Sequence, residues 1–512
     1  MDSNENTRKP RSESDYNGVK FEKVPSEPTD VLPPPVVAVP TPSPGGNRQE
    51  ATSMRRLYFA VFTAYLGSLG FGFAITYSSP ALPDLRPKMS FTAEHSTWFG
   101  SLVKCGSIFG GFLGGQLVNI LGRRATLWVS CAWFLAGWLC IIFAPSIALL
   151  FTGRALTGIA VGIVAPAVPV FISEISPARI RGLLNTGSNV LLFVGILTTY
   201  LLGKWLTYKY LAAALMAPTA LMTILLFWTK ESPRWLLQKG RRDEALESVL
   251  FYHGPEGKTE LSAIEDSLSG TETFHFRELW KPYIYRPFLT MLMVMFVQQS
   301  SAIGVIVVYT NDIFRESGTS IASDDCSIII GVVQVVVVAA ASVLTDRVGR
   351  KILLLLSTFA SSLCLFLFGY SFYLKEHSAE TFALSYSWLP VVSMGLLFAA
   401  INIGLGHLPW VLLGEMLPLR VKGFATGFST SFCFGYAFLL IKEFYRLQIF
   451  LGVAGSYWLF GALLLVGCIL IWFLLPETKG KTLEEIEKLF GKEHTNSAEN
   501  AAIRRKTYLP DM

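Results

Sequence analysis

Two nine-residue segments place the same kinds of residue at the same spacing, although they lie far apart in the chain. EISPARIRG begins at Glu174 and EMLPLRVKG begins at Glu415; each opens with an acid, has proline at its fourth position and closes with a basic residue and glycine. The acids can form ion pairs with the closing bases, Arg181 and Lys422, and such pairs can break when the protein changes conformation. Such groups act as a switch between conformations rather than as catalysts.

A second pair of segments repeats in the same order and at nearly the same offset: LGRRATL at 121–127 and VGRKILL at 348–354. The charges that we expect at the same level as the two acids are Arg123, Arg124, Arg154, Asp346 and Arg350. Exposed ion pairs contribute only ~0–1 kcal/mol each, so a shared network of them biases a conformational equilibrium without locking it. The alternative is that these cations only hold the connecting turns on one side of a membrane.

The elements that position these charges are apolar. The chain has 512 residues, of which 52% are hydrophobic and 16% charged, whereas a soluble domain carries about a quarter charged residues. The apolar residues form runs of about 20, the length of a helix that crosses a ~30 Å hydrocarbon layer. Twelve such runs are predicted, at 57–79, 98–119, 125–144, 147–172, 184–203, 210–229, 288–311, 326–345, 352–374, 388–414, 424–445 and 453–475.

The predicted fold is an all-α membrane protein with twelve transmembrane helices in two six-helix halves. The predicted domains are a disordered cytoplasmic tail, the first half, a cytoplasmic helical linker, the second half and a cytoplasmic C-terminal tail, at 1–53, 54–230, 231–287, 288–476 and 477–512. An even number of spans puts both termini on the side of the basic turns, which is the cytoplasmic side. Basic residues on the cytoplasmic side thus explain the net charge of +6. We therefore expect the lipid bilayer as a partner, and no nucleic acid.

The chain lacks the patterns of other chemistries. Most of its seven cysteines fall inside apolar runs, and its six histidines show no metal-ligand spacing. KGKTL at 479–483 contains part of a phosphate loop, but Leu475 stands where the leading glycine belongs. We therefore expect no cofactor, no metal, no nucleotide and no enzyme activity. Two matched six-span halves instead indicate a transporter that holds its substrate between them.

Further motifs carry a resemblance to a known family. They are ESPRWLL at 231–237, QQSSAIGVIVVYT at 298–310, GLGHLPWVLLGE at 404–415 and LPETKGKTLEEIE at 475–487. Together with the repeated segments, the chain resembles the sugar porter family of the major facilitator superfamily over residues 55–490. TYSSPALPDL at 76–85 is most similar to insect facilitated trehalose transporters. The resemblance implies a multi-pass plasma-membrane protein with a small sugar as its substrate.

The resemblance also implies the sugar-binding residues. Gln298 and Gln299 match amides of the seventh span, and amides offer both donors and acceptors to hydroxyls; hydrogen bonding between helices is their alternative role. Trp410 follows a helix-breaking proline and offers an indole face to a sugar ring. Asn402 adds an amide, and Tyr309 is expected to help close the outer gate.

Three departures from the family pattern concern the substrate and its coupling. Asn189 replaces a glutamine and Gly304 replaces an asparagine, which enlarges the cavity and favours a disaccharide, trehalose. Ala74 stands where proton-driven relatives carry an aspartate, so we expect a passive uniporter. A glucose-type hexose uniporter and a non-transporting sugar sensor remain open as alternatives. Lys104, in the second span, is left open between pairing with an acid, reaching outward and touching substrate.

Overall fold

The computed structural model describes residues 46–254, 257–268, 280–417, 422–479 and 489–490. The predicted tail at 1–53 and the predicted C-terminal tail fall largely outside these residues. The described residues are almost entirely helical and contain no β-strand. This agrees with the all-α class predicted from the apolar runs.

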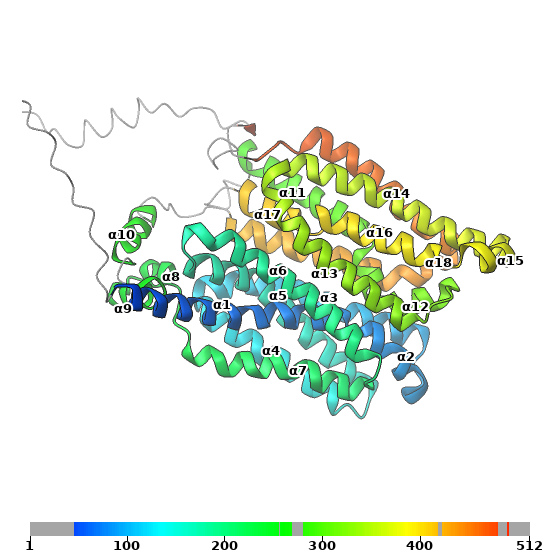
Figure 1. Cartoon of the computed structure of the whole chain (residues 1–512), viewed down its shortest axis with the longest axis horizontal. Coiled ribbons are helices and arrows are strands. Elements are labelled where there is room, and N and C mark those ends of the chain that lie inside the picture. Colours follow the sequence, from blue (N-terminus) through cyan, green and yellow to red (C-terminus); the bar gives the residue numbers. More distant parts are fainter. Residues whose placement is uncertain (1–45, 255–256, 269–279, 418–421, 480–488, 491–512) are drawn as a thin grey trace, which may run out of the picture. The chain divides into compact units, whose positions relative to one another are not determined.

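The first half is built from seven helices (Figure 1). Six of them are long, and α2 is a short helix between the first two spans. Their bounds are α1 Gly46–Thr76, α2 Ser78–Met89, α3 Ala93–Ile120, α4 Arg123–Ile142, α5 Ile147–Ile175, α6 Ala178–Gly203 and α7 Tyr208–Leu225. A 3-10 turn at Leu226–Trp228 then leads out of the half.

Three short helices follow: α8 Pro233–Gln238, α9 Arg242–His253 and α10 Gly257–Leu268. They pack on one another through a small apolar cluster that includes Trp235, Val249 and Leu261. A separate cluster of this kind matches the prediction of surface helices between the sixth and seventh spans.

The second half contains helices with two breaks. Its bounds are α11 Pro282–Ser300, α12 Ile303–Ser317, α13 Ser323–Val348, α14 Arg350–His377, α15 Ala379–Thr381, a π-helical turn at Phe382–Tyr386, α16 Leu389–Ile403, α17 Leu408–Met416 and α18 Lys422–Leu474. The seventh span is interrupted between α11 and α12, where Ala302 adopts a left-handed conformation with φ of 58°. The tenth span is interrupted between α16 and α17, where Pro409 opens the new helix.

Twelve spans emerge from these helices. Ten of the described segments are long and apolar enough to cross a membrane, and one of these is Phe424–Leu474. Gly452, with φ of 75°, divides that segment into two spans. The helix α3 is long enough for another span but is interrupted by many glycines and polar residues. The predicted twelve-helix fold is thus confirmed.

Glycines bring α3 and α5 unusually close together. A Cβ added to Gly106 would lie 2.2 Å from the carbonyl oxygen of Ala155, and one added to Gly158 would lie 2.2 Å from that of Val103. Only glycine therefore permits this approach of the two backbones. Both helices belong to the first half, so this packing stiffens that half.

Among the described residues, the two halves meet mainly through the pairs α3 with α18, α6 with α13, and α2 with α12. We call the end of the bundle that carries Arg123 and Arg350 the basic end, and the opposite end the α2 end. In Figure 1 the basic end is on the left, near α8 and α9, and the α2 end is on the right.

Candidate substrate site and charge networks

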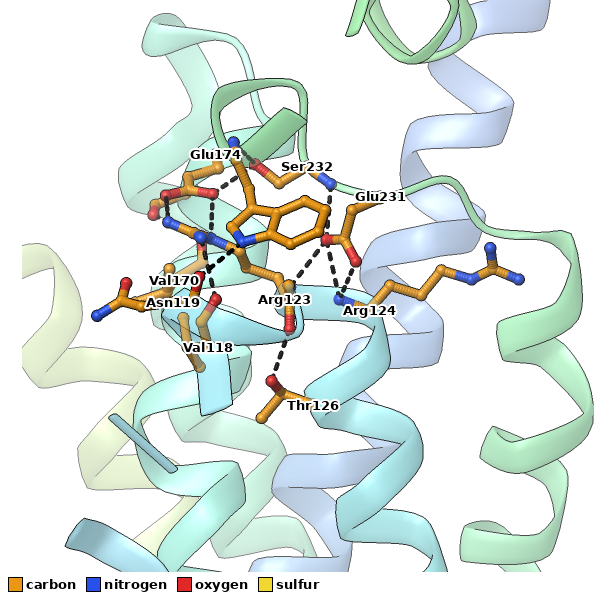
Figure 2. A network of polar contacts seen from close by, with 12 residues as sticks. Val118, Asn119, Arg123, Arg124, Thr126, Val170, Glu174, Glu231 and Ser232 are labelled. Atoms are coloured by element: carbon orange, nitrogen blue, oxygen red, sulfur yellow. Dashed lines mark hydrogen bonds and ion pairs between the residues drawn. The ribbon is translucent and has the colours of Figure 1, made fainter. Parts of the chain in front are cut away.

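Arg123 is the centre of the network at the basic end of the first half (Figure 2). Its Nε lies 2.6 Å from Oε2 of Glu174, and its Nη2 donates to Oε1 of the same carboxylate at 2.7 Å. Nη1 donates to the carbonyl of Val118 at 3.1 Å, and the hydroxyl of Ser232 donates to Glu174. Both charged side chains are nearly buried, with 5% and 11% exposed. Their pairing therefore avoids the large cost of an unpaired buried charge.

Glu231 caps the helix that begins at Arg123. Its Oε1 accepts from the backbone N–H groups of Arg123 and Arg124, at 2.8 and 3.0 Å. A carboxylate there satisfies the unpaired N–H groups of the first helical turn and complements the positive end of the helix dipole. The residue before the helix, Gly122, has φ of 102°, and a Cβ on it would lie 2.5 Å from Oε2 of Glu231. Glycine at this turn is therefore required both by the backbone conformation and by the carboxylate.

The second half repeats this arrangement. Arg350 donates to Glu415 at 3.1 Å, and the Thr478 hydroxyl donates to the same carboxylate at 2.9 Å. Glu477 accepts from the backbone N–H groups of Arg350 and Lys351, at 3.0 and 3.1 Å. Gly349 has φ of 105°, as Gly122 has φ of 102° in the first half. The repeated segments of the sequence therefore build two copies of one network.

Burial favours the neutral form of the Glu477 carboxyl, but backbone N–H donors more than offset it. The donors are Lys479, Arg350, Lys351 and Thr478, and together they hold the pKa of Glu477 below its ordinary value of 4.5. The carboxylate is accordingly the form that the fold selects at neutral pH.

Glu231 and Glu477 were not among the candidate residues chosen from the sequence. The available signal was the repeat of an acid and a hydroxyl residue, Glu-Ser and Glu-Thr, directly after the sixth and twelfth spans. Of the other predicted members, Arg181 is exposed and donates to the carbonyl of Ser176 at 3.3 Å. The side chains of Asp346 and Lys422 lie outside the described part of the chain.

Arg154 requires a correction. It lies near the start of α5, whereas Glu174 lies at the end of the same helix, 20 residues and therefore ~30 Å away. The prediction that Arg154 shares the level of Glu174 was wrong, because the fourth span begins at the α2 end. Arg154 is fully buried and donates to the carbonyls of Ala74 and Phe99 and to the Ser78 hydroxyl, at 2.8, 3.3 and 2.7 Å.

At the α2 end, polar contacts join the two halves. Arg86 of α2 pairs with Asp312 of α12, and the Ser79 hydroxyl accepts from the backbone N–H of Asn311 at 3.1 Å. Lys204, after α6, pairs with Asp325 of α13. These contacts link α2 and α6 of the first half to α12 and α13 of the second.

Tyr309 lies one turn from Asp312 in α12 and is almost fully buried. Its ring stacks on Phe444 at 6.0 Å and meets Tyr445 edge-on at 5.2 Å. The Tyr445 hydroxyl in turn lies 3.4 Å from the Asp312 carboxylate. Tyr309 thus packs against α18 of its own half, directly beside the inter-half ion pair.

Gln298 connects the two broken spans. It is the third residue from the end of α11, and its Nε2 donates to the carbonyls of Leu405 and Gly406 at 3.0 and 2.9 Å. A break in a membrane-spanning helix frees backbone carbonyls, which require donors because lipid supplies none. Both amide N–H groups of Gln298 are therefore used by the break, and its Oε1 accepts from the Cys433 thiol at 3.7 Å, a weak donor that leaves the oxygen able to accept a further hydrogen bond.

Gln299 lies beside Gly304, near the start of the next helix. Its Nε2 donates to the Cys433 sulfur at 3.1 Å. A Cβ added to Gly304 would lie 3.5 Å from Oε1 of Gln299 and no closer to any other atom outside its own helix. These are ordinary contact distances, so a Cβ fits at this position without displacing its neighbours.

The remaining predicted residues lie in different surroundings. Asn402 is buried, and its Nδ2 donates to the Phe398 carbonyl of its own helix at 2.9 Å. Trp410 is half-buried and lies 6.2 Å from the Phe434 ring, which belongs to α18. Asn189 is exposed on α6. The structure therefore groups Gln298, Gln299 and Trp410 around the two breaks.

Gln334 was missed by the sequence analysis. It is fully buried in α13, and neither its amide oxygen nor its amide nitrogen has a hydrogen-bond partner in the described part of the chain. An unsatisfied buried amide is costly and calls for an explanation. A run of valines surrounds Gln334 in the sequence, so a lone amide there was the available signal.

Two six-helix halves with broken spans and buried amides between them define the class of protein: a membrane transporter of the major facilitator type. The model of the sugar (and other) transporter family matches residues 60–490. The chain belongs to this family of sugar porters, and it is accordingly a transporter and not an enzyme.

Curated relatives agree with this assignment. The chain is 36% identical over 469 residues to the facilitated glucose transporter member 8 of Bos taurus, covering 87% of this chain and 96% of the relative. It is 35% identical over 436 residues to the facilitated trehalose transporter Tret1 of Bombyx mori, covering 84% and 85%.

Solved structures share the fold. The proton:xylose symporter XylE bound to 6-bromo-6-deoxy-D-glucose matches with a TM-score of 0.70 and 24% identity, covering 85% of this chain and 99% of the symporter. A partially occluded inward-open conformation of XylE from E. coli matches with a TM-score of 0.72 and 22% identity, covering 84% and 100%.

Proposed function

We propose that this chain is a passive carrier that moves trehalose across the plasma membrane by alternating access. The observation that carries the proposal is the position of Gln298 and Gln299, buried at the break of the seventh span and bonded to the break of the tenth and to α18. The names of its relatives, which include facilitated trehalose and glucose transporters, support a sugar as the substrate.

In this proposal the sugar lies between the halves, close to the two breaks. The Oε1 atoms of Gln298 and Gln299 accept hydrogen bonds from sugar hydroxyls, and the Asn402 amide adds a further acceptor. The indole of Trp410 covers the C–H face of a sugar ring. Tyr309 closes the site from the α2 end, and Asn189 contributes from the first half.

The basic end faces the cytoplasm, and both termini lie on that side, because short connecting segments rich in Arg and Lys stay inside. The ion pair between Arg86 and Asp312 then closes the outer side of the carrier. When that pair breaks, the halves rock, the outer side opens and the basic end closes. Because Arg123–Glu174 and Arg350–Glu415 lie within their own halves, each half moves as a unit.

The coupling to protons is absent in this proposal. Ala74 offers only its carbonyl, which accepts from Arg154 at 2.8 Å. No carboxylate pairs with Arg154 among the side chains that the structure describes. Without a group that binds and releases a proton there, a proton gradient has nothing to act on, and the flux follows the sugar gradient alone.

Glucose is the second candidate substrate, because the bovine relative is named a glucose transporter. The absence of a side chain at Gly304 favours the larger sugar, since an asparagine there would take room from the substrate. A small hexose at the same site makes fewer hydrogen bonds, each worth ~0.5–1.5 kcal/mol.

Uptake of labelled trehalose and labelled glucose into proteoliposomes that contain the purified protein tests the proposal. We expect saturable, reversible trehalose uptake that stops at equal concentrations and is insensitive to a protonophore. Accumulation against the gradient that a protonophore abolishes would refute uniport. Preference for glucose would make the chain a hexose carrier, and the absence of any flux with sugar binding retained would make it a sensor.

A further inference from the structure

Lys104 in α3 is a buried cation in the interior of the bundle. The residue is only 8% exposed, and its Nζ lies 5.1 Å from the centre of the Phe434 ring in α18. None of the described carboxylates forms an ion pair with it. An aromatic face offsets part of the cost of burying an ammonium, but it accepts no conventional hydrogen bond from the three N–H groups.

Two other cations, both at the α2 end, donate hydrogen bonds to oxygen atoms of the protein and serve as a comparison. Arg154, equally buried, donates to two carbonyls and a hydroxyl. Lys442 of α18 lies 4.5 Å from the Trp98 ring and also donates to the Thr97 hydroxyl at 3.1 Å. Lys104 has the ring contact without an oxygen acceptor among the described residues. The described residues thus leave the N–H groups of Lys104 able to donate to an acceptor on a bound substrate.

The surroundings of Lys104 coincide with the candidate substrate site. Phe434 follows Cys433, which accepts from Gln299, and the Phe434 ring lies 6.2 Å from Trp410. The ammonium comes from α3 in the first half, whereas the amides and the indole come from the second half. A substrate held by Gln299 and Trp410 would accordingly lie close to the ammonium, because both residues neighbour the Cys433–Phe434 segment that Lys104 contacts.

We propose that Lys104 is a substrate-contacting residue that gives the carrier affinity for sugars with one carboxylate, the uronic acids. This inference rests on the proposed function, since it adds an acidic sugar to the substrates of the same site. The ring hydroxyls bond to the amides as in a neutral sugar, and the carboxylate accepts from the ammonium of Lys104. A carboxylate next to a buried ammonium removes the cost of leaving that charge unpaired.

One lysine matches one negative charge, and this selects a carboxylate over a phosphate monoester. A phosphate monoester carries nearly two charges at neutral pH, and its second charge would need another cation. The other buried cations described in the first half have partners of their own: Arg154 is occupied by its three acceptors, and Arg123 is paired with Glu174 at the basic end. The amides and the indole around the site are neutral. A doubly charged sugar phosphate would therefore bring an uncompensated charge into the bundle.

Binding of D-glucuronate, D-glucose and acetate to the purified full-length protein tests the proposal without requiring transport. Tryptophan fluorescence titration gives the dissociation constants for the native protein, Lys104→Met, Lys104→Arg and Lys442→Met. We expect native protein to bind glucuronate about tenfold more tightly than glucose, because the carboxylate gains a charge partner. Lys104→Met should abolish that preference, and Lys104→Arg should retain part of it. Lys442→Met, which removes the other lysine–aromatic contact between the halves, should leave the ratio of the two constants unchanged.

Three results would overturn the proposal. Native protein that binds glucuronate no better than glucose would show that the ammonium does not meet a substrate carboxylate. Lys104→Met with an unchanged ratio would assign the preference to another residue. Acetate that binds as tightly as glucuronate would show a site for any carboxylate. If glucuronate binds through Lys104 but no sugar crosses the membrane, the carrier function fails while this assignment stands. If trehalose crosses the membrane without a preference for glucuronate, only this assignment fails.

Discussion

Arg86 and Asp312 form a two-point ion pair across the boundary between the halves, with distances of 2.7 Å from Nη1 to Oδ1 and 2.6 Å from Nη2 to Oδ2. The Asp312 side chain is only 7% exposed, and the Arg86 side chain is 32% exposed. By contrast, Arg123–Glu174 and Arg350–Glu415 at the basic end each stay within one half. Among the side chains that the structure describes, the ionic contacts that join the halves are therefore at the α2 end.

Replacing Asp312 by Asn should favour the conformation that is open at the α2 end. The change removes a charge from a partly buried two-point pair, and hydrogen bonds to charged groups contribute ~1.5–3 kcal/mol. Ser79→Cys places a thiol under the closed contact, since Ser79 is buried and bonds to Asn311. We expect its labelling by a membrane-impermeant maleimide to accelerate at least several-fold in Asp312→Asn.

Arg446→Met is the matched control for this experiment, because the exposed pair of Arg446 with Glu443 lies within α18 and joins no two helices. It should leave the labelling rate of the Ser79 thiol unchanged. Equal labelling in Asp312→Asn and in the parent protein would show that the Arg86–Asp312 pair does not hold the α2 end closed.

Glu231→Gln and Glu477→Gln should destabilise the two halves to a similar extent. Each carboxylate caps a helix by accepting from two backbone N–H groups, and the loss of such a cap costs ~0.5–2 kcal/mol. The apparent Tm in detergent, followed by tryptophan fluorescence, should fall by a few degrees in each variant. The two decrements should add in the double variant, because the sites share no partner. A decrement in one half only would contradict the equivalence of the two networks.

Glu415→Gln should lower the rate of sugar turnover more than it lowers sugar affinity. Glu415 binds Arg350 and Thr478 at the basic end, away from the breaks that hold the candidate substrate residues. We expect a reduced kcat for trehalose uptake with KM changed by no more than about twofold, as for an interaction that acts on the conformational change. If Glu415→Gln transports sugar at the normal rate, the repeated acid acts only in setting the topology of the chain in the membrane.

Gly304→Asn should shift the sugar preference toward glucose. A Cβ fits at this position at ordinary distances, 3.5 Å from Oε1 of Gln299. The added amide would fill the space that a second glucose unit needs and would offer a new hydrogen bond worth ~0.5–1.5 kcal/mol to a small sugar. Competition between labelled trehalose and glucose measures the effect, which should be several-fold. A native preference for glucose that the variant leaves unchanged would refute the enlarged-cavity explanation.

The contribution of Glu477 to stability should disappear in acid. Because the pKa of the folded state lies below the ordinary 4.5, the carboxylate stabilises the fold above that value, and the contribution is lost as the pH falls through the lowered pKa. The difference in apparent Tm between native protein and Glu477→Gln should be full at neutral pH, should decrease once the pH falls below the ordinary value of 4.5, and should close when the pH lies below the lowered pKa. A difference that persists in acid would show that the charge of Glu477 is not what stabilises the turn.

Much of the fold could be predicted from the sequence because a helix that crosses the lipid bilayer needs about 20 consecutive apolar residues. Apolar runs of the right length predicted the spans, and Pro409 predicted the interruption of the tenth, whereas the interruption of the seventh span at Ala302 was not predicted. The exact pairing of charges was not readable, because spacing along the chain gives only the level of a residue in the bundle. Arg154 shows this limit: an arginine in the fourth span was assigned to the basic end, but the direction of the span puts it at the α2 end.

Sequence alone could propose members of the candidate site but not the bonds that they make. The resemblance pointed to Gln298 and Gln299, and both lie at the break of the seventh span. That Gln298 uses both amide N–H groups on the freed carbonyls of Leu405 and Gly406 depends on how two distant breaks meet. The pair between Arg86 and Asp312 could likewise not be predicted from the sequence, since the two residues are 226 positions apart.

The self-contained networks at the basic end also bear on the origin of the chain. Every described carboxylate in them bonds within its own six-helix half, and each half supplies its own helix-capping acid. A protein of half the length would already contain every group that this turn needs. A gene that doubled could therefore keep both copies working from the start, and later divergence was free to act on residues at the boundary, such as Arg86, Lys104 and Asp312.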